Sequence, residues 1–272
     1  MMKYNTVLTI AGSDSGGGAG VQADIKTISA CGCYATSAIT AVTIQNTIGV
    51  TGVHPVPTNI IEQQVLAVLD DIGTDAIKIG MLHNAEVVSC IAHLLNKYNI
   101  TNVVLDPVMV STSGHRLIEE NAIATLKAEL IPLARVITPN IPEAELLLGQ
   151  KLNRQELLPN AAQILAETFS TSVLLKAGHL EDDRLVDIFY NLEDKTVTEL
   201  PSTRILSRNT HGTGCTMSSA LASYLAKGYS LTEAVQAAKQ YINDAINAGA
   251  DYEIGHGHGP VCHFYNLWKP ER

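Results

Sequence analysis

The sequence predicts an α/β domain with a mainly parallel central sheet and helices on both of its faces. Short apolar runs alternate with segments of helical periodicity along the chain, a pattern typical of βαβ crossovers. Hydrophobic residues make up 46% of the chain and charged residues only 17%, so a large core is expected. No internal repeat or low-complexity linker interrupts residues 1–272, and we therefore expect a single domain.

Each expected element follows from its own pattern of apolar residues. Apolar runs without helical spacing predict strands, whereas apolar residues that recur every three or four positions predict helices. The expected strands are residues 7–11, 34–42, 76–81, 102–109, 135–138 and 173–176, with a hairpin of 184–190 and 196–200. One helix is expected to begin near residue 21. The other expected helices cover about 60–69, 85–98, 119–130, 143–148, 213–227 and 231–248.

Charge and cysteine content limit the expected partners and location. The chain has 18 Lys and Arg against 27 Asp and Glu, a net charge of −9. A surface of that sign repels the phosphates of nucleic acids and anionic lipids, so neither nucleic acid nor membrane is an expected partner. Apolar runs fall well short of the roughly 20 residues that span a bilayer. The odd number of cysteines, five, favours reduced thiols and a cytoplasmic location.

A glycine-rich turn over residues 12–20 (GSDSGGGAG) follows the first expected strand and opens a helix. Ligands of parallel α/β sheets bind beyond the carboxyl ends of the strands, and N–H groups at a helix start favour anions or polar ligand atoms. The turn matches neither the P-loop pattern nor GxGxxG, and tight packing alone is an alternative explanation for its glycines. Asp24, one helical turn further on, favours a functional role.

A second glycine-rich segment, residues 209–216 (NTHGTGCT), opens the helix that starts near residue 213. Gly212 and Gly214 flank Thr213, which allows successive N–H groups to face one point and form an anion nest. Cys215 lies in the first turn of this helix, where the helix dipole is expected to lower the pKa of its thiol towards neutrality. The alternative is that Cys215 is a small apolar residue in a tightly packed helix start.

Four further polar residues follow the ends of expected strands: Asp106, Asn140, Glu143 and Lys176. Mg²⁺ usually takes one or two carboxylates together with waters and phosphate oxygens, and a lysine beside an anion nest suits phosphoryl transfer. Each residue also has a structural explanation, because Asp106 could cap a turn and Glu143 could favour the first turn of a helix. Their coincidence at strand ends favours a phosphoryl-transfer site.

Together, these segments resemble the bacterial hydroxymethylpyrimidine/phosphomethylpyrimidine kinases of thiamine biosynthesis, within the ribokinase-like superfamily. The matching segments span nearly the whole chain in the order found in that family. They are 8–16 (LTIAGSDSG), 18–26 (GAGVQADIK), 41–47 (AVTIQNT), 78–82 (KIGML), 104–109 (VLDPVM), 137–144 (ITPNIPEA), 176–179 (KAGH), 209–216 (NTHGTGCT) and 257–261 (GHGPV).

The resemblance implies a fold and a reaction. It implies a ribokinase-like domain without a separate lid domain, commonly a homodimer, that uses ATP and Mg²⁺. The implied reaction phosphorylates 4-amino-5-hydroxymethyl-2-methylpyrimidine to its monophosphate and then to the diphosphate. The implied pyrimidine pocket contains Gly12, Ala19, Asp24, Gln45, Met81, Val108 and Cys215.

The resemblance also implies a role for each site residue. Cys215 stands where most of the superfamily has an Asp base, and it would accept or polarise the hydroxyl proton. The N–H groups from Gly212 to Cys215 would hold the transferring phosphoryl charge, while Asp24 and Gln45 would bind the amino and ring-nitrogen edge. The residues expected at the nucleotide are Asn140, Lys176 and Thr213, and those expected at Mg²⁺ are Asp106 and Glu143.

Three other functions remain open from the sequence. Pyridoxal or pyridoxine kinase is a sister activity with a similar ring-bound hydroxymethyl acceptor, and comparison of rates on the two alcohols separates the two. A thiol hydrolase or acyl transferase would use Cys215 with His211, although no third group to orient the histidine is evident. A catalytically silent sensor of nucleotide or pyrimidine would leave the base, the lysine and the carboxylates without a use.

Overall fold

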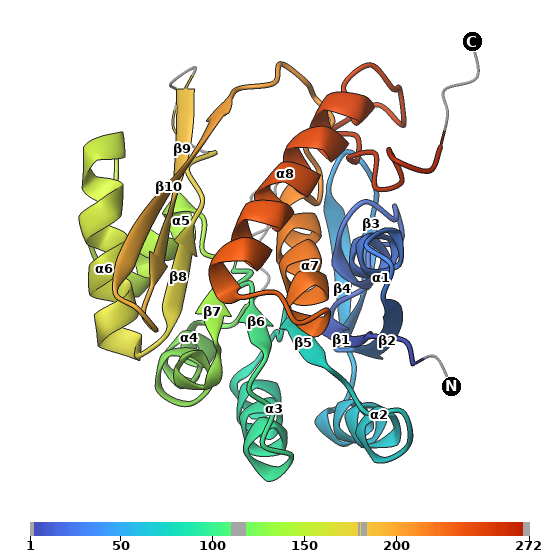
Figure 1. The fold of residues 1–272 in the computed structure, drawn as a ribbon. Helices are drawn as coiled ribbons and strands as arrows, with labels where there is room; N and C mark the ends of the chain where they lie inside the picture. The colour runs from blue at the N-terminus through green and yellow to red at the C-terminus, as the bar shows by residue number, and fades with distance from the viewer. Residues whose placement is uncertain (1–2, 110–117, 179, 181–183, 269–272) are drawn as a thin grey trace.

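The computed structural model describes residues 3–109, 118–178, 180 and 184–268, so His179 of the matching segments lies outside the described residues. Within these ranges one sheet has the strand order β10-β9-β8-β7-β6-β5-β1-β2 (Figure 1). The neighbours from β2 to β8 pair in parallel, and β8, β9 and β10 pair antiparallel. The predicted mainly parallel sheet is confirmed. Its strands are β1 (Thr6–Ala11), β2 (Tyr34–Ile39), β5 (Ala76–Ile79), β6 (Val103–Leu105), β7 (Val136–Ile137), β8 (Ser172–Leu175), β9 (Arg184–Asn191) and β10 (Thr196–Thr203).

Helices cover both faces of this sheet, as predicted, and a separate core lies under each set. Strand side chains alternate between the two cores: Leu8 and Ile10 belong to one, whereas Val7 belongs to the other. One face carries α1 (Gly20–Ala30), α7 (Thr213–Ala226) and α8 (Leu231–Gly249) (Figure 1). The other carries α2 (Thr58–Asp71), α3 (Ala85–Lys97), α4 (Glu120–Thr125), α5 (Ile141–Leu148) and α6 (Leu158–Phe169). None of the described helices combines the length and apolar content needed to cross a bilayer.

The chain departs from the predicted elements at residues 34–42, which form two strands instead of one. β2 ends at Ile39, and β3 (Ala41–Gln45) pairs with β4 (Val50–Pro55) in a separate two-stranded antiparallel sheet. Thr40 lies between them, with its N–H donating to the Ala11 carbonyl and its hydroxyl to the Met81 carbonyl. These two bonds hold the chain at the carboxyl ends of β1 and β5, so β3 leaves the main sheet there.

Register brings the carboxyl ends of the parallel strands to one edge of the sheet. Ile10 of β1 pairs with Ile79 of β5, and Ile79 pairs with Leu105 of β6. The residues that follow these strands therefore meet at that edge, as do those that follow β7 and β8. The predicted strand-end residues are consequently neighbours in space although they lie far apart in the sequence.

Candidate active site

The two glycine-rich segments lie directly against each other at the carboxyl edge of the sheet. Gly212 has a φ of 78°, and a Cβ at this position would overlap the Gly18 carbonyl oxygen and lie 3.2 Å from the Ala19 Cα. A residue with a side chain would be strained by its backbone conformation and excluded by this contact. The start of α7, including Thr213 and Gly214, is therefore held beside the turn that opens α1.

Cys215 lies half-buried in the first turn of α7, close to Lys78 and the Gly20 N–H. Burial raises the pKa of its thiol to about 11, and the carboxylates of Asp24 and Asp106 act in the same direction. Lys78 and the Gly20 N–H lower the pKa, but they do not outweigh the burial. The pKa of this thiol is therefore raised and not lowered as predicted, because burial disfavours the thiolate more than Lys78 and the Gly20 N–H favour it.

Asp24 is committed to a buried ion pair with Lys78, and both side chains are fully inaccessible. The Lys78 Nζ lies 2.9 Å from each carboxylate oxygen of Asp24. The hydroxyls of Thr9 and Ser219 donate to the same carboxylate over 2.6 and 2.7 Å. These four bonds use the acceptor sites of the carboxylate. In this structure Asp24 therefore faces protein groups, and its predicted contact with a pyrimidine ring remains untested.

Asp106 and Lys176 form a second ion pair, which lies beside the start of α7. The Lys176 Nζ is 2.9 Å from the Asp106 Oδ1, and the Thr138 hydroxyl donates to the same oxygen over 2.9 Å. Although burial works against ionisation, Lys176 and Lys78 hold the pKa of Asp106 below its usual value. A Cβ at Gly214 would lie 3.2 Å from the Lys176 Nζ and 3.3 Å from the Asp106 Oδ2. The pair is thus adjacent to the predicted anion nest.

Asn140 and Glu143 form a capping box at the start of α5. The Glu143 N–H donates to the Asn140 Oδ1 over 2.9 Å, and the Asn140 N–H donates to the Glu143 Oε2 over 2.8 Å. Burial raises the pKa of Glu143 to about 7, and Asp106 adds to this rise while Lys176 opposes it. Glu143 therefore has the structural role of completing the cap of α5. It also lies near the Asp106–Lys176 pair.

The carboxylates of Asp106 and Glu143 fit the donor set of one Mg²⁺ ion. Both are buried carboxylates that lie near the Lys176 ammonium. Within the described part of the chain, no group of three or more His, Cys, Asp or Glu residues could enclose a metal ion. Two carboxylates suffice for Mg²⁺ in phosphoryl-transfer sites, because waters and phosphate oxygens complete its coordination.

A small apolar cluster lies between the main sheet and the β3–β4 sheet. Met81 and Ala41 are buried, and Val53 and Val108 pack against them. A Cβ at Gly12 would lie 3.1 Å from the Met81 Sδ and 3.6 Å from the Ala41 carbonyl oxygen. The structure therefore brings the predicted pocket residues Gly12, Met81 and Val108 together.

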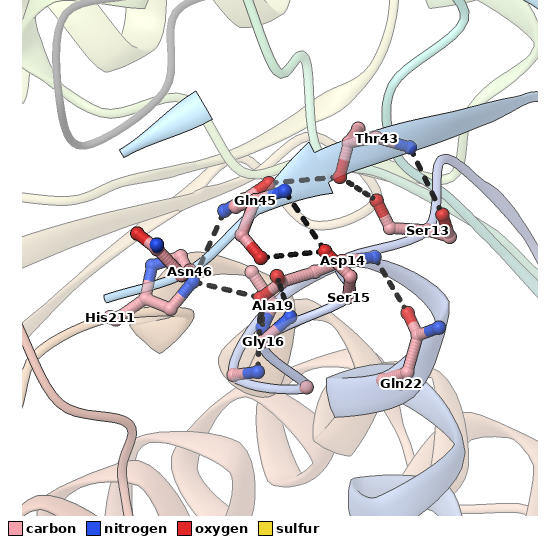
Figure 2. Close-up of polar contacts among 12 residues, drawn as sticks. Ser13, Asp14, Ser15, Gly16, Ala19, Gln22, Thr43, Gln45, Asn46 and His211 are labelled. Atoms are coloured by element: carbon pink, nitrogen blue, oxygen red, sulfur yellow. Dashed lines mark hydrogen bonds and ion pairs between the residues drawn. The ribbon is translucent and has the colours of Figure 1, made fainter. Parts of the chain in front are cut away.

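Gln45, at the end of β3, contacts a polar network that was not predicted from the sequence (Figure 2). Its Nε2 lies 3.2 Å from the His211 Nε2, which in turn lies 2.9 Å from the Asp14 Oδ2. Asp14 also accepts hydrogen bonds from the backbone N–H groups of residues 16, 18 and 19. Burial alone would raise the pKa of Asp14, but the bonds from His211 and these N–H groups lower it.

His211 does not form the dyad that a thiol hydrolase would need. Its Nε2 contacts are Asp14 and Gln45, and the groups that act on the Cys215 thiol are Lys78, the two buried carboxylates and the Gly20 N–H. The hydrolase alternative therefore has no support among the described contacts.

The carboxyl edge of the sheet thus brings the start of α7 together with Lys176 and the carboxylates of Asp106 and Glu143, and the apolar cluster around Met81 lies at the same edge. Such groups are suited to charge stabilisation and positioning in phosphoryl transfer to a small acceptor, and the arrangement is typical of small-molecule phosphotransferases. A family model described as phosphomethylpyrimidine kinase matches residues 14–262. The chain belongs to this family, and the resemblance predicted from its motifs is confirmed.

Two relatives carry the name of this family, and a pyridoxal kinase is also similar over most of the chain. A hydroxymethylpyrimidine/phosphomethylpyrimidine kinase of Rhizobium meliloti is 48% identical, over 96% of this chain and 98% of its own. The crystal structure of a phosphomethylpyrimidine kinase from Clostridium difficile is 44% identical with a TM-score of 0.78, covering 89% of this chain and 99% of that chain. An ADP complex of Bacillus subtilis pyridoxal kinase is 35% identical with a TM-score of 0.89, covering 98% of this chain and 100% of that chain.

Proposed function

We propose that the protein uses ATP and Mg²⁺ to phosphorylate 4-amino-5-hydroxymethyl-2-methylpyrimidine to its monophosphate and then to the diphosphate, for thiamine biosynthesis. The observation that carries this proposal is the position of the Asp106–Lys176 pair beside Gly214. This pair brings the charges that phosphoryl transfer requires to the helix start that holds Cys215. The phosphomethylpyrimidine kinase family and the Rhizobium meliloti relative support the choice of acceptor.

Both transfers follow the same bond changes. A bond forms between an acceptor oxygen and the γ-phosphorus of ATP, the bond from that phosphorus to the β–γ bridging oxygen breaks, and ADP leaves. The N–H groups from Gly212 to Cys215 and the Lys176 ammonium would stabilise the charge on the transferring group. Mg²⁺, when bound, would neutralise charge on the phosphates, with Asp106 and Glu143 holding it directly or through its waters.

The two acceptors differ in their need for a base. The hydroxymethyl group must lose a proton in the first transfer, and we assign its removal to the thiolate form of Cys215. A pKa of about 11 makes that form scarce near neutral pH, but a loose transition state places a small demand on the base. In the second transfer the monophosphate already offers ionised oxygens, because the second pKa of a phosphate ester is about 6. Cys215 is then needed mainly for the first transfer.

Replacing Gln45 by Ala tests whether a single site performs both transfers. We expect kcat/KM to fall for the alcohol and for the monophosphate alike, because both acceptors present the same ring edge to the lost amide. The fall should correspond to a loss of about 1–3 kcal/mol of transition-state stabilisation. The measurement is steady-state kinetics with each purified acceptor. Gln163→Ala is the matched control, since this exposed glutamine bonds to Glu167 on the surface of α6. Loss of the first transfer with the second intact would rule out a single shared site.

Pyridoxal kinase remains a second candidate activity, favoured by the similarity to the Bacillus subtilis enzyme. The apolar residues around Met81 could pack against a substituted pyridine as well as against a pyrimidine. Rates with pyridoxal and with the hydroxymethylpyrimidine under the same conditions decide between them, and the proposal requires a higher kcat/KM for the pyrimidine.

A further inference from the structure

We propose that His211 and Asp14 fix the orientation of the Gln45 side-chain amide, and that this orientation makes the site specific for a 4-amino over a 4-oxo pyrimidine. The inference rests on the proposed function, which places Gln45 at the acceptor ring. His211 is then a positioning residue for specificity, since it acts on the ring through Gln45.

The contact with Asp14 determines where the His211 ring carries a proton. Asp14 is 1% exposed and accepts hydrogen bonds from three backbone N–H groups in addition to His211, so its environment favours the ionised carboxylate. A lone pair on the His211 Nε2 would be repelled by a carboxylate oxygen at 2.9 Å. The Nε2 therefore carries a proton and donates it towards Asp14.

The Gln45 amide has two orientations, which differ by a half-turn about its last side-chain bond. With the Nε2 towards His211, two N–H donors face each other across 3.2 Å. The Oε1 then faces the Thr43 hydroxyl at 3.3 Å, although that hydroxyl also donates to the Ser13 carbonyl over the shorter distance of 2.7 Å. Both contacts in this orientation are therefore poorly matched.

The reversed orientation satisfies both neighbours. The Gln45 Oε1 then shares the proton that His211 directs at Asp14, and the Gln45 Nε2 donates to the oxygen of Thr43. One lone pair and one N–H of the amide remain available for a ligand. The surroundings of Gln45 thus select one orientation before any acceptor binds.

The two groups that contact the Gln45 amide, the His211 ring and the Thr43 hydroxyl, are firmly held. The His211 N–H donates to the Gly259 carbonyl, and residue 211 forms a parallel bridge with Pro260. A Cβ at Gly18 would overlap the imidazole edge, so the ring lies directly on the glycine-rich turn. Thr43 is 4% exposed in β3 and is bonded to Ser13 through both its N–H and its hydroxyl (Figure 2). Rotation of the amide therefore has to occur against fixed partners.

A fixed amide distinguishes two ring edges that have nearly the same shape. A 4-aminopyrimidine presents an N–H donor next to a ring-nitrogen acceptor, whereas a 4-oxo ring presents a carbonyl acceptor next to an N–H donor. The ring cannot simply turn over, because its hydroxymethyl group must point at the transferring phosphoryl group. Binding of the oxo ring would require the other orientation of the amide, with the Nε2 towards His211, and this orientation has the mismatched contacts with His211 and Thr43.

The test compares kcat/KM for the 4-amino and 4-oxo forms of 5-hydroxymethyl-2-methylpyrimidine, with calorimetric affinities for both rings measured without ATP. We expect the wild-type protein to prefer the amino ring, and His211→Phe to reduce this preference by about tenfold, the effect of one hydrogen bond. His211→Gln keeps an N–H donor near the position of Nε2 and should retain the preference. His258→Phe, which replaces an exposed histidine, is the control and should also retain it.

A merely structural role of His211 would lower both activities together and leave their ratio unchanged. That result with folded His211→Phe overturns the inference. If His211→Phe does not fold, Thr43→Val decides, because it removes the other partner of the amide and should also reduce the preference; an unchanged ratio there overturns the inference. If the wild-type protein does not phosphorylate the amino ring, the proposed function itself fails, and this outcome is distinct from the other two.

Discussion

Replacement of Lys176 by Met is expected to lower kcat of both transfers by about 10²–10³-fold, the range for loss of a donor that stabilises transition-state charge. The Lys176 ammonium is 2.9 Å from Asp106 and lies against the position of Gly214. We also expect a lower free energy of unfolding, by about 3–5 kcal/mol, because the buried Asp106 carboxylate loses its partner. The measurement is ADP release at a temperature where circular dichroism shows the variant to be folded.

Lys151→Met is the matched control for this prediction. Lys151 has an 85% exposed side chain that bonds to Glu145 at the surface, and surface pairs contribute little to stability. Its kcat and melting temperature should stay close to those of the wild-type protein. A folded Lys176→Met variant with a kcat within a few-fold of wild type would contradict the role assigned to Lys176.

Replacement of Cys215 by Ala is expected to lower kcat of the first transfer by about 10²-fold, as for loss of a general base, while the second transfer changes by only a few-fold. Since the pKa of the thiol is about 11, the thiolate fraction rises about tenfold per pH unit below that value. Where chemistry limits the rate, kcat of the first transfer should therefore rise with pH above neutrality, and the variant should lose this rise.

The pH profile is measured at saturating Mg²⁺, so that ionisation of Glu143, whose pKa is about 7, does not alter metal binding. Cys90→Ala, which changes a half-buried cysteine in α3, is the control and should retain the wild-type profile. Equal losses in both transfers, or a profile that survives in Cys215→Ala, would show that Cys215 positions the acceptor and does not accept its proton.

The mainly parallel fold follows from local sequence patterns, but two of its features were not predicted from them. The break between β2 and β3 is fixed by bonds from Thr40 to Ala11 and Met81, and an apolar run carries no sign of such partners. Helix α6 is an addition to the predicted elements. Its buried stripe contains Ala161, Ala162 and Ala166 as well as larger residues, and alanines give a weak periodic signal.

The position of the site was predictable because parallel strands end at one edge, and this edge brings Asp106 close to Lys176. The chemical state of individual groups was not. The pKa of Cys215 depends on burial, and Asp24 in α1 forms a buried ion pair with Lys78 in β5. One signal in the sequence pointed to this pair: Lys78 interrupts an otherwise apolar strand, and a buried lysine requires an acidic partner.

The central claim is that one site transfers phosphoryl groups twice to a hydroxymethylpyrimidine. The most direct measurement follows the products of a reaction with ATP, Mg²⁺ and 4-amino-5-hydroxymethyl-2-methylpyrimidine by ³¹P NMR, with a chelator in the parallel reaction. We predict that the pyrimidine monophosphate appears first and is then converted to the diphosphate, with one ADP released in each transfer and no product in chelator. Hydrolysis of ATP without a phosphorylated pyrimidine, or a monophosphate that accumulates without conversion, would contradict the claim.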